Sequence, residues 1–303
     1  MACVIYEHDK RLIMSITRKL VRINTPEGQP GFLGAGHTAR PVIGGRFSES
    51  DPFIFLMDDW LDKRDNDPVG GPHPHAGFET VSLLIEGEFG DEDHRMKGGD
   101  FEIMTAGSGI VHTETIDKKT KLRLLQLWLT LPKKDRWATP RVQELPLEHV
   151  PVLAQNGVTI KLYSGSLAGL TSPIQNYSPM IVADVTIEAR VPTVQQIPAN
   201  YNTFLYVING NVKVGEDEKL LNQDQVGWLD LPGDVTKSEL KLMAGENGVR
   251  FVLYAGKPTG DNIVSQGPFI ADSLEDLQRL YQEYRQGKMK HISTVPQSQR
   301  ILL

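Results

Sequence analysis

The sequence predicts an all-β protein of two tandem domains with the same fold, followed by a short C-terminal helix. Most of its 303 residues form short apolar stretches separated by Gly, Pro, Asn and Asp, a pattern typical of a β-sandwich or barrel. At roughly 150 residues per domain, the length suits two domains. We assign residues 1–140 to the first domain and residues 141–303 to the second.

Three stretches illustrate the expected strands. Residues 80–85 end at a Glu-Gly pair, and residues 122–131 place leucine at every second position from 125 to 131, as expected for a strand with one buried face. Residues 203–208 are followed by Asn209-Gly210, a favoured hairpin turn.

An internal repeat relates the two halves. A shift of about 123 residues superimposes one stretch of strand and turn, and a shift of about 126 superimposes the next. These shifts pair Thr80 with Thr203, Ile85 with Ile208, Gly87 with Gly210 and Gly107 with Gly233. Two matches at nearly one offset predict duplicated domains.

The helix is predicted at residues 274–286. Ser273 can cap its first turn with Asp276 in the capping-box position, apolar residues follow at helical spacing, and Gly287 is a suitable stop.

Composition narrows the function classes. The chain has 32 Lys and Arg against 38 Asp and Glu, a net charge of −6, which argues against direct nucleic-acid binding. Its apolar runs are far shorter than a membrane span, and its first residues show no signal-peptide pattern. The single cysteine, Cys3, excludes an internal disulfide. We therefore expect a cytoplasmic protein with no membrane partner.

Two short motifs in the first half carry the chemistry. His73 and His75 project to one side if the segment is extended, and His112 and Glu114 have the same spacing. Two such strands facing each other would point three imidazoles and one carboxylate at a single point. That set of ligands suits a first-row divalent metal ion with open positions.

The repeat provides an internal control for this metal site. The shifts place Gln196 and Pro198 opposite His73 and His75, and Ser238 and Leu240 opposite His112 and Glu114. Because the second copy loses every ligand, we predict one metal site, in the first domain.

Other polar residues near the motifs stay open at this point. Glu79 could be a ligand, a partner that orients an imidazole, or simply polar. We interpret His94 as solvated and GFLGAG at 31–36 as a loop, since no βαβ context follows it.

These residues resemble the pirin family of the cupin superfamily, through nearly the whole chain. The similar segments are DPFIFLMDDW at 51–60, HPHAGFETV at 73–81, MTAGSGIVHTE at 104–114 and YAGKP…GPFIADS at 254–273. The resemblance implies a bicupin whose first barrel holds iron through His73, His75, His112 and Glu114 and whose second barrel holds none. It also implies that Glu79 is not a ligand but a neighbour of the ligands or a structural residue.

The chain departs from the family pattern in three places. Ala76 stands where family members usually have a basic residue, the hairpin at 90–98 is short, and the first 30 residues are unfamiliar. These departures bear on the entrance and preference of the pocket.

The resemblance also implies an activity like that of quercetin 2,3-dioxygenase, which opens a flavonol ring with O2 and releases carbon monoxide. Fe(II) is the expected cofactor, with Mn, Ni, Co, Cu or Zn as alternatives, and Glu114 or Glu79 is the expected base. The alternative is a non-enzymatic, iron- and redox-dependent regulator that binds a transcription factor or a metabolic enzyme.

Overall fold

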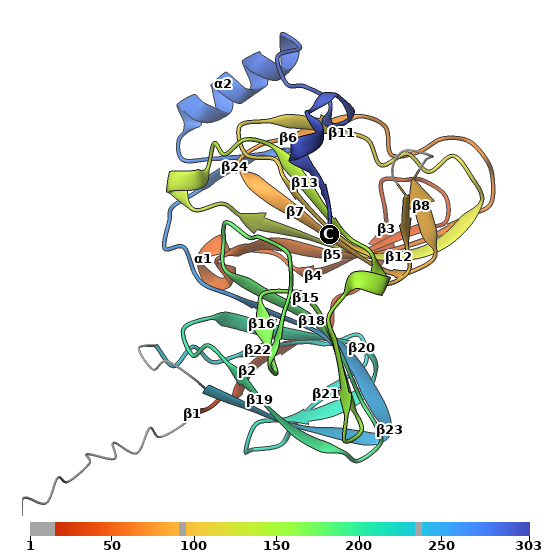
Figure 1. Cartoon of the computed structure of the whole chain (residues 1–303), viewed down its shortest axis with the longest axis vertical. Coiled ribbons are helices and arrows are strands. Elements are labelled where there is room, and N and C mark those ends of the chain that lie inside the picture. The colour runs from red at the N-terminus through yellow and green to blue at the C-terminus, as the bar shows by residue number, and fades with distance from the viewer. Residues whose placement is uncertain (1–15, 91–94, 234–237) are drawn as a thin grey trace, which may run out of the picture.

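The computed structural model describes residues 16–90, 95–233 and 238–303 of the chain. Most of this structure is β-strand, and the strands form two large sheets, one above the other (Figure 1). The expected all-β fold of two similar halves with a C-terminal helix is confirmed. Cys3, and His94 in the hairpin 90–98, lie outside the described residues.

The first sheet has eight strands in the order β26-β13-β10-β7-β12-β5-β4-β3. Their bounds are β3 (Gln29–Pro30), β4 (His37–Ile43), β5 (Phe53–Lys63), β7 (Phe78–Glu86), β10 (Phe101–Thr105), β12 (Thr120–Thr130), β13 (Arg141–Leu145) and β26 (Arg300–Leu302). Two short pairs, β6 (His73–His75) with β11 (Ile110–His112) and β8 (Glu88–Gly90) with β9 (Arg95–Lys97), complete what we call the first barrel.

The second sheet has ten strands and is called the second barrel. Its main path is β14-β15-β18-β23-β20-β22-β2, with β1 and β19 on β23 and β21 on β20. The bounds are β1 (Ile16–Thr17), β2 (Leu20–Asn24), β14 (Val152–Gln155), β15 (Val158–Ser164), β18 (Met180–Ile187), β19 (Pro192–Ile197), β20 (Asn202–Val214), β21 (Lys219–Asn222), β22 (Val226–Leu229) and β23 (Ser238–Gly256). A small pair, β16 (Ser166–Leu167) with β17 (Leu170–Thr171), flanks it.

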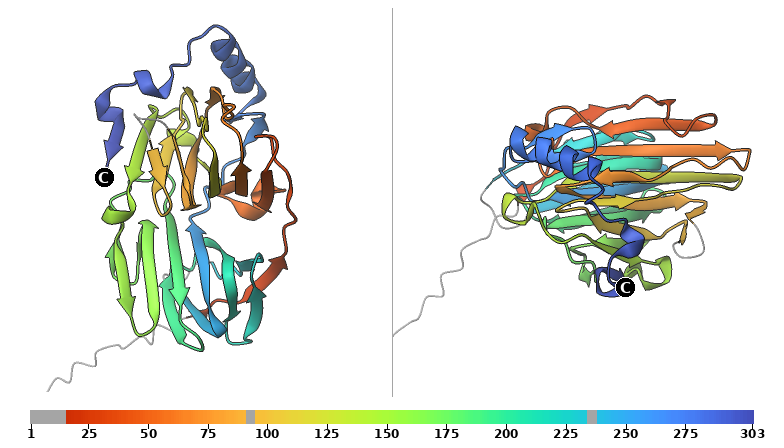
Figure 2. Two further views of the ribbon diagram at one scale, coloured as in Figure 1. Left: turned by 90° about the vertical axis from the view of Figure 1, so that its right-hand side faces the viewer. Right: turned by 90° about the horizontal axis from the view of Figure 1, so that it is seen from above.

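The two barrels exchange their terminal segments. Strands β1 and β2 pair with β23 and β22 of the second barrel, whereas the C-terminal segment returns to the first barrel, where β26 pairs with β13 (Figure 2). The returning segment includes the pair β24 (Val264–Gln266) with β25 (Phe269–Ala271). The boundary at residues 140 and 141 stays a prediction, because segments from both sides of it enter each barrel.

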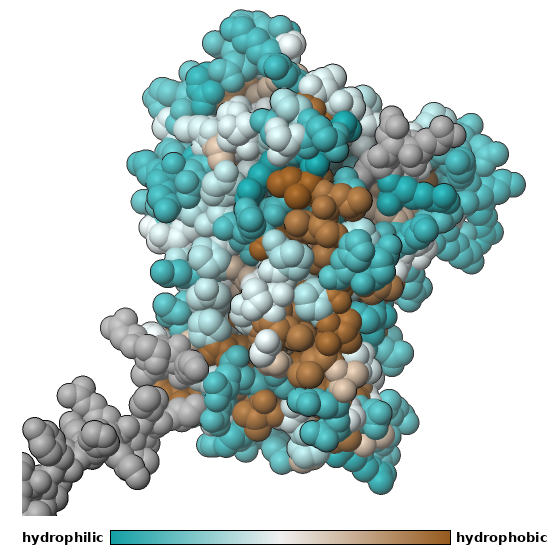
Figure 3. All heavy atoms as spheres, in the orientation of Figure 1, coloured by the Kyte–Doolittle hydropathy of each residue, from teal (hydrophilic) through white to brown (hydrophobic). Residues whose placement is uncertain are grey.

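A shared apolar core joins the facing sheets. It takes alternate residues from strands of both barrels, and aromatic rings sit at its centre. Phe53 meets Phe204 edge to face at 5.2 Å, and Phe204 stacks on Tyr254 at 4.9 Å between ring centres. On the outside, hydrophilic residues surround a band of exposed apolar residues that crosses from one barrel to the other (Figure 3).

The predicted turn at Asn209-Gly210 is wrong. Strand β20 runs through it as a bulge, with register shifts on both sides. Gly210 has φ +75°, and a Cβ there would lie 2.1 Å from the Gly248 carbonyl oxygen; Gly87 has φ +87° and the same 2.1 Å approach to Lys121. Both copies of the repeat therefore need glycine for a close strand contact.

The predicted C-terminal helix is confirmed as α2 (Leu274–Arg285), in which the Ser273 side chain caps the Asp276 amide. The remaining helical segments are short: α1 (Phe47–Ser50), η1 (Lys133–Asp135), η2 (Leu147–His149), η3 (Ile292–Thr294) and η4 (Gln297–Gln299). Among the described residues, no helix is long and apolar enough to cross a membrane.

Candidate metal centre

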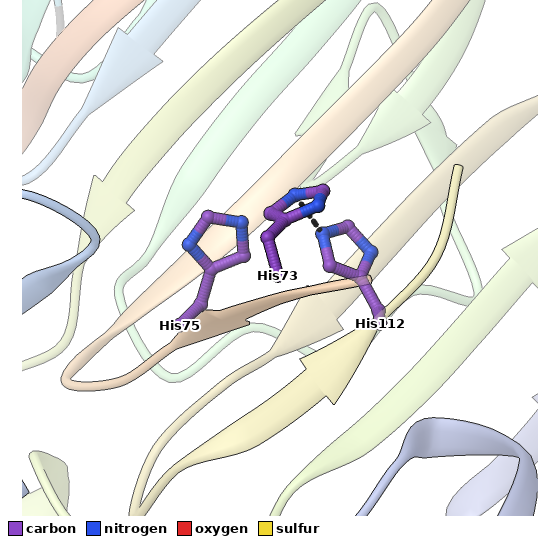
Figure 4. A group of neighbouring side chains, drawn as sticks. All are labelled: His73, His75 and His112. Atoms are coloured by element: carbon purple, nitrogen blue, oxygen red, sulfur yellow. Dashed lines mark hydrogen bonds between the residues drawn. The ribbon is translucent and has the colours of Figure 1, made fainter. Parts of the chain in front are cut away.

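The β6–β11 pair brings the three predicted histidines together. Strand alternation puts His73 and His75 on one side of β6, and the register places His112 directly opposite His73. Figure 4 shows the three rings converging, and their candidate ligand nitrogens all lie within 4.8 Å of one another.

The spacing of the rings fits a shared ion. Nε2 of His112 lies 2.8 Å from Nε2 of His73, and the ring centres are 4.3 to 5.0 Å apart. Two imidazole nitrogens bound at right angles to one divalent ion, each about 2.1 Å away, would lie about 3 Å apart. The donor set and its spacing therefore suit a first-row divalent metal.

The surroundings hold the His75 ring in the neutral form that binds metals. Burial, reinforced by the neighbouring His112 and His73, lowers the pKa of His75 to about 2. Nδ1 of His73 lies 2.9 Å from the Gly71 carbonyl oxygen. A hydrogen on Nδ1 would donate to that carbonyl and leave Nε2 free for the ion.

Glu114 lies near the histidines but outside their group. Strand β11 ends at His112, so the expected strand alternation does not extend to Glu114. The Glu114 side chain lines the same cavity as His73 and His75, and its Oε1 accepts a hydrogen bond from Nε2 of Gln126 at 3.4 Å. Its role as the fourth ligand stays a prediction.

The structure does not bring Glu79 together with the histidines. On β7, Glu79 lies opposite Leu129 of β12 and Thr105 of β10. Leu129 belongs to the core between the barrels, so Glu79 is on the face of the strand that points toward that core. Thr105 Oγ1 donates to Glu79 Oε1 at 2.7 Å, and complete burial raises the pKa of Glu79 to about 7. Among the described residues, no hydrogen bond joins Glu79 to the histidines, and its role as neighbour of the ligands or as base stays a prediction.

A cavity of about 620 Å³ opens beside the histidines, a size suited to a small organic ligand. Its walls are mainly aromatic and aliphatic, and Trp128 packs 5.2 Å from His75 and 4.4 Å from Phe55 between ring centres. The polar side chains that reach it are those of His37, Asp59, His73, His75, Glu114 and Gln126.

His37 and Asp59 are functional candidates that the sequence analysis missed. Nε2 of His37 lies 2.8 Å from Oδ1 of Asp59, and both residues line the cavity. Asp59 interrupts the otherwise apolar face that Phe55, Met57 and Leu61 form on β5. A carboxylate on an apolar strand face was the signal that could have revealed it.

Ala76 lies under the returning C-terminal segment. It is fully buried, and its carbonyl oxygen accepts a hydrogen bond from the Ile270 amide at 3.0 Å. It packs in a cluster with Phe269, Leu277 and Leu280. The C-terminal segment therefore covers Ala76, the position that departs from the family pattern.

The second barrel has different side chains at the matching strand pair. In β19 and the first part of β23, the buried residues include Gln195, Ile197, Ser238 and Leu240, whereas Gln196 is exposed. His112 pairs with His73, whereas Ser238, the predicted match of His112, pairs with Ile197, so the register moves the predicted match of His73 from Gln196 to Ile197. In the described part of the chain, the group that could hold a metal ion is His73, His75 and His112.

Comparison with known proteins agrees with this architecture. Residues 37–129 match the family model described as Pirin, and residues 182–290 match the Pirin C-terminal cupin domain. Pirin of Rattus norvegicus is 33% identical over 265 residues, covering 84% of this chain and 88% of its own.

Two solved structures share the fold. A quercetin 2,3-dioxygenase from Acinetobacter baumannii superimposes with a TM-score of 0.78 at 22% identity, covering 91% of this chain and 99% of its own. The bacterial pirin YhhW from Escherichia coli, in complex with nickel(II), gives 0.60 at 16% identity, covering 78% and 99%. With its paired cupin barrels and its sequence matches in both halves, the chain belongs to the pirin family.

Proposed function

We propose that this protein is a metal-dependent dioxygenase of the quercetin 2,3-dioxygenase type, with Fe(II) as its cofactor and a flavonol-like aromatic substrate. The observation that carries the proposal is that His73 and His75 of the three-histidine cluster line a cavity with largely aromatic and aliphatic walls. A metal site beside a largely apolar cavity suits a flat aromatic ligand with an oxygen that reaches the ion. The fold shared with the Acinetobacter enzyme is consistent with this choice.

His73, His75 and His112 would hold the ion, with Glu114 as the predicted fourth ligand. The bound metal would supply Lewis acidity toward a substrate hydroxyl and a position for O2. Around it, Trp128 and Phe55 would hold the substrate rings and exclude water. Gln126 holds the Glu114 carboxylate through the hydrogen bond described above.

The overall reaction balances without an added reductant. Two bonds of the flavonol central ring break, one ring carbon leaves as carbon monoxide, and both atoms of O2 enter the opened product. The hydroxyl proton must leave before the ring opens. The Glu114 carboxylate faces the cavity and is the ligand-set residue we assign to accept it.

The test is aerobic turnover of quercetin by protein loaded with Fe(II), followed by loss of the flavonol absorbance. His112→Ala should abolish turnover and metal retention, whereas His149→Ala, which changes a histidine that contacts the Leu303 carbonyl oxygen, should preserve both. Absence of turnover in protein that holds stoichiometric Fe, Mn, Ni, Co, Cu or Zn would contradict the enzyme. That outcome would favour the iron-dependent regulator that binds a protein partner.

A further inference from the structure

A second polar group lies in the cavity, away from the metal ligands in the sequence. Asp59 is on β5, where Phe55, Met57, Asp59 and Leu61 face the cavity from one side of the strand. Its neighbour Asp58 faces the opposite way, where Arg123 donates two hydrogen bonds of 2.9 Å and Tyr206 donates one of 2.7 Å. The two adjacent carboxylates therefore have opposite roles, and Asp58 is already satisfied by the core.

The structure fixes the orientation of the Asp59 carboxylate through His37. The Leu33 amide donates to Nδ1 of His37 at 3.1 Å, so the ring hydrogen resides on Nε2. Nε2–H then donates to Asp59 Oδ1 at 2.8 Å. Because the His37 side chain is completely buried, this chain of hydrogen bonds holds Asp59 in one position.

The loop at residues 31–36 is shaped around His37. A Cβ on Gly31 would lie 2.0 Å from the His37 ring, so glycine is required for this approach. The next residue, Phe32, meets the same ring edge to face at 5.5 Å, yet is 84% exposed. Phe32 also lines the cavity, where an exposed aromatic ring can stack on an aromatic ligand.

The second carboxylate oxygen of Asp59 is available to a ligand. Among the described residues, no side chain or amide donates a hydrogen bond to Oδ2, and the side chain is only 14% exposed. Burial raises the pKa of Asp59. The hydrogen bond from His37 lowers this pKa, and the nearby charges of Asp58 and Glu114 raise it further. A half-buried carboxylate in an apolar cavity gains most from a donor that a ligand brings.

We propose that Asp59, positioned by His37, accepts a hydrogen bond from a hydroxyl group of the ligand, apart from the oxygen that meets the metal. The cavity would then select polyhydroxylated aromatic molecules, with one hydroxyl at the histidine cluster and another at Asp59. This inference rests on the proposed function for the aromatic class of the ligand. The part that goes beyond it is the choice among such ligands by their additional hydroxyl groups.

The experiment measures anaerobic binding of two flavonols to the metal-loaded full chain by quenching of tryptophan fluorescence. Quercetin carries several hydroxyls, whereas 3-hydroxyflavone carries only the one next to the ring carbonyl. Asp59→Asn keeps the shape and the acceptor for His37. Asp62→Asn is the control, because it changes a partly exposed aspartate of the same strand that pairs with Arg64 and Lys121. Metal content and thermal unfolding are measured for each variant.

We expect Asp59→Asn to weaken quercetin binding by about 10- to 100-fold, the usual effect of one hydrogen bond to a charged group. Binding of 3-hydroxyflavone and binding to Asp62→Asn should stay within about 2-fold of the unsubstituted chain, because neither involves the lost contact. Equal weakening of both flavonols, or no weakening of either, would overturn the inference. If Asp59→Asn does not fold, the affinity of the unsubstituted chain for methylated quercetins decides. The inference is overturned if no methylated hydroxyl weakens binding.

The anaerobic readout separates this inference from the proposed function. Selective loss of quercetin binding without aerobic turnover would remove the dioxygenase and keep Asp59 as the selecting residue. Aerobic turnover, together with equal effects of Asp59→Asn on the binding of both flavonols, would keep the dioxygenase and remove Asp59 as the selecting residue. Absence of binding of either flavonol to the unsubstituted chain would overturn both.

Discussion

The two barrels have the same strand plan and differ in what fills them. In the first, β7 and β12 pair Ser82 with Gln126 on the interior face; in the second, β20 and β23 pair Leu205 with Leu253. The first barrel keeps three histidines and a cavity of about 620 Å³, whereas aliphatic side chains pack the second interior. One copy of the fold is thus built for a ligand and the other for stability.

The largest expected effect tests which barrel holds the metal. His75→Ala should lower metal affinity by more than about 100-fold, because loss of a residue that merely supports a ligand already costs about 10- to 100-fold. Gln195→Ala, at a buried position of β19 in the second barrel, should leave the metal content unchanged. Elemental analysis after dialysis measures both. Metal retained by His75→Ala would break the comparison at its central point.

The next effect tests the packing of the second interior. Leu253 is almost completely buried among aliphatic residues, so Leu253→Ala should lower the free energy of unfolding by about 2 to 5 kcal/mol. Gln126→Ala, its counterpart beside the cavity, should cost less than about 1 kcal/mol. Urea unfolding followed by circular dichroism gives both values. Equal losses would mean that the first barrel depends on its interior as much as the second does.

The parts of this comparison that the sequence predicts are local. His73 and His75 share one strand, so their spacing alone puts both side chains on one side, and His112 lies in a second motif whose spacing marks it as a candidate ligand. The pair of His37 and Asp59 could not be predicted in that way, because the two residues are 22 positions apart and only the register of β4 on β5 brings them together.

The errors have equally physical causes. A single shift placed Gln196 opposite His73, although the register of β19 on β23 pairs Ile197, not Gln196, with Ser238, the match of His112. Asn209-Gly210 has the composition of a hairpin turn, but pairing with β23 on both sides of it turns it into a bulge. In each case contacts with distant strands decided what the local pattern left open.

A smaller effect depends on pH and on a carboxyl group found in only one barrel. Glu79 is completely buried with a pKa raised to about 7 by desolvation, from 4.5 in the unfolded chain, whereas the strand register gives the second barrel Asn202 at that place. The folded chain binds this proton more tightly. The resulting stability, up to about 3 kcal/mol, is therefore complete below pH 4.5 and is lost as the pH rises through 7.

Glu79→Gln tests this linkage, because the amide keeps the shape and cannot ionise. The stability of the variant relative to the unsubstituted chain should increase between pH 5 and pH 8, each measured by urea unfolding. Glu27→Gln, which changes an exposed glutamate, should follow the unsubstituted chain at both values. A difference that stays constant with pH would show that Glu79 ionises as readily in the folded chain as in the unfolded one.

The smallest expected effect concerns the coupling of the two barrels. The Tyr206 hydroxyl of the second barrel donates to Asp58 of the first at 2.7 Å and accepts from Arg40 at 3.3 Å. Tyr206→Phe should lower the free energy of unfolding by only about 1 to 2 kcal/mol, because Arg123 keeps its two hydrogen bonds to Asp58. Tyr284→Phe, on the exposed side of α2, is the control for urea unfolding. A loss well above that range, or two separate unfolding transitions, would show that the barrels depend on this polar contact more than on the aromatic core around Phe53 and Phe204.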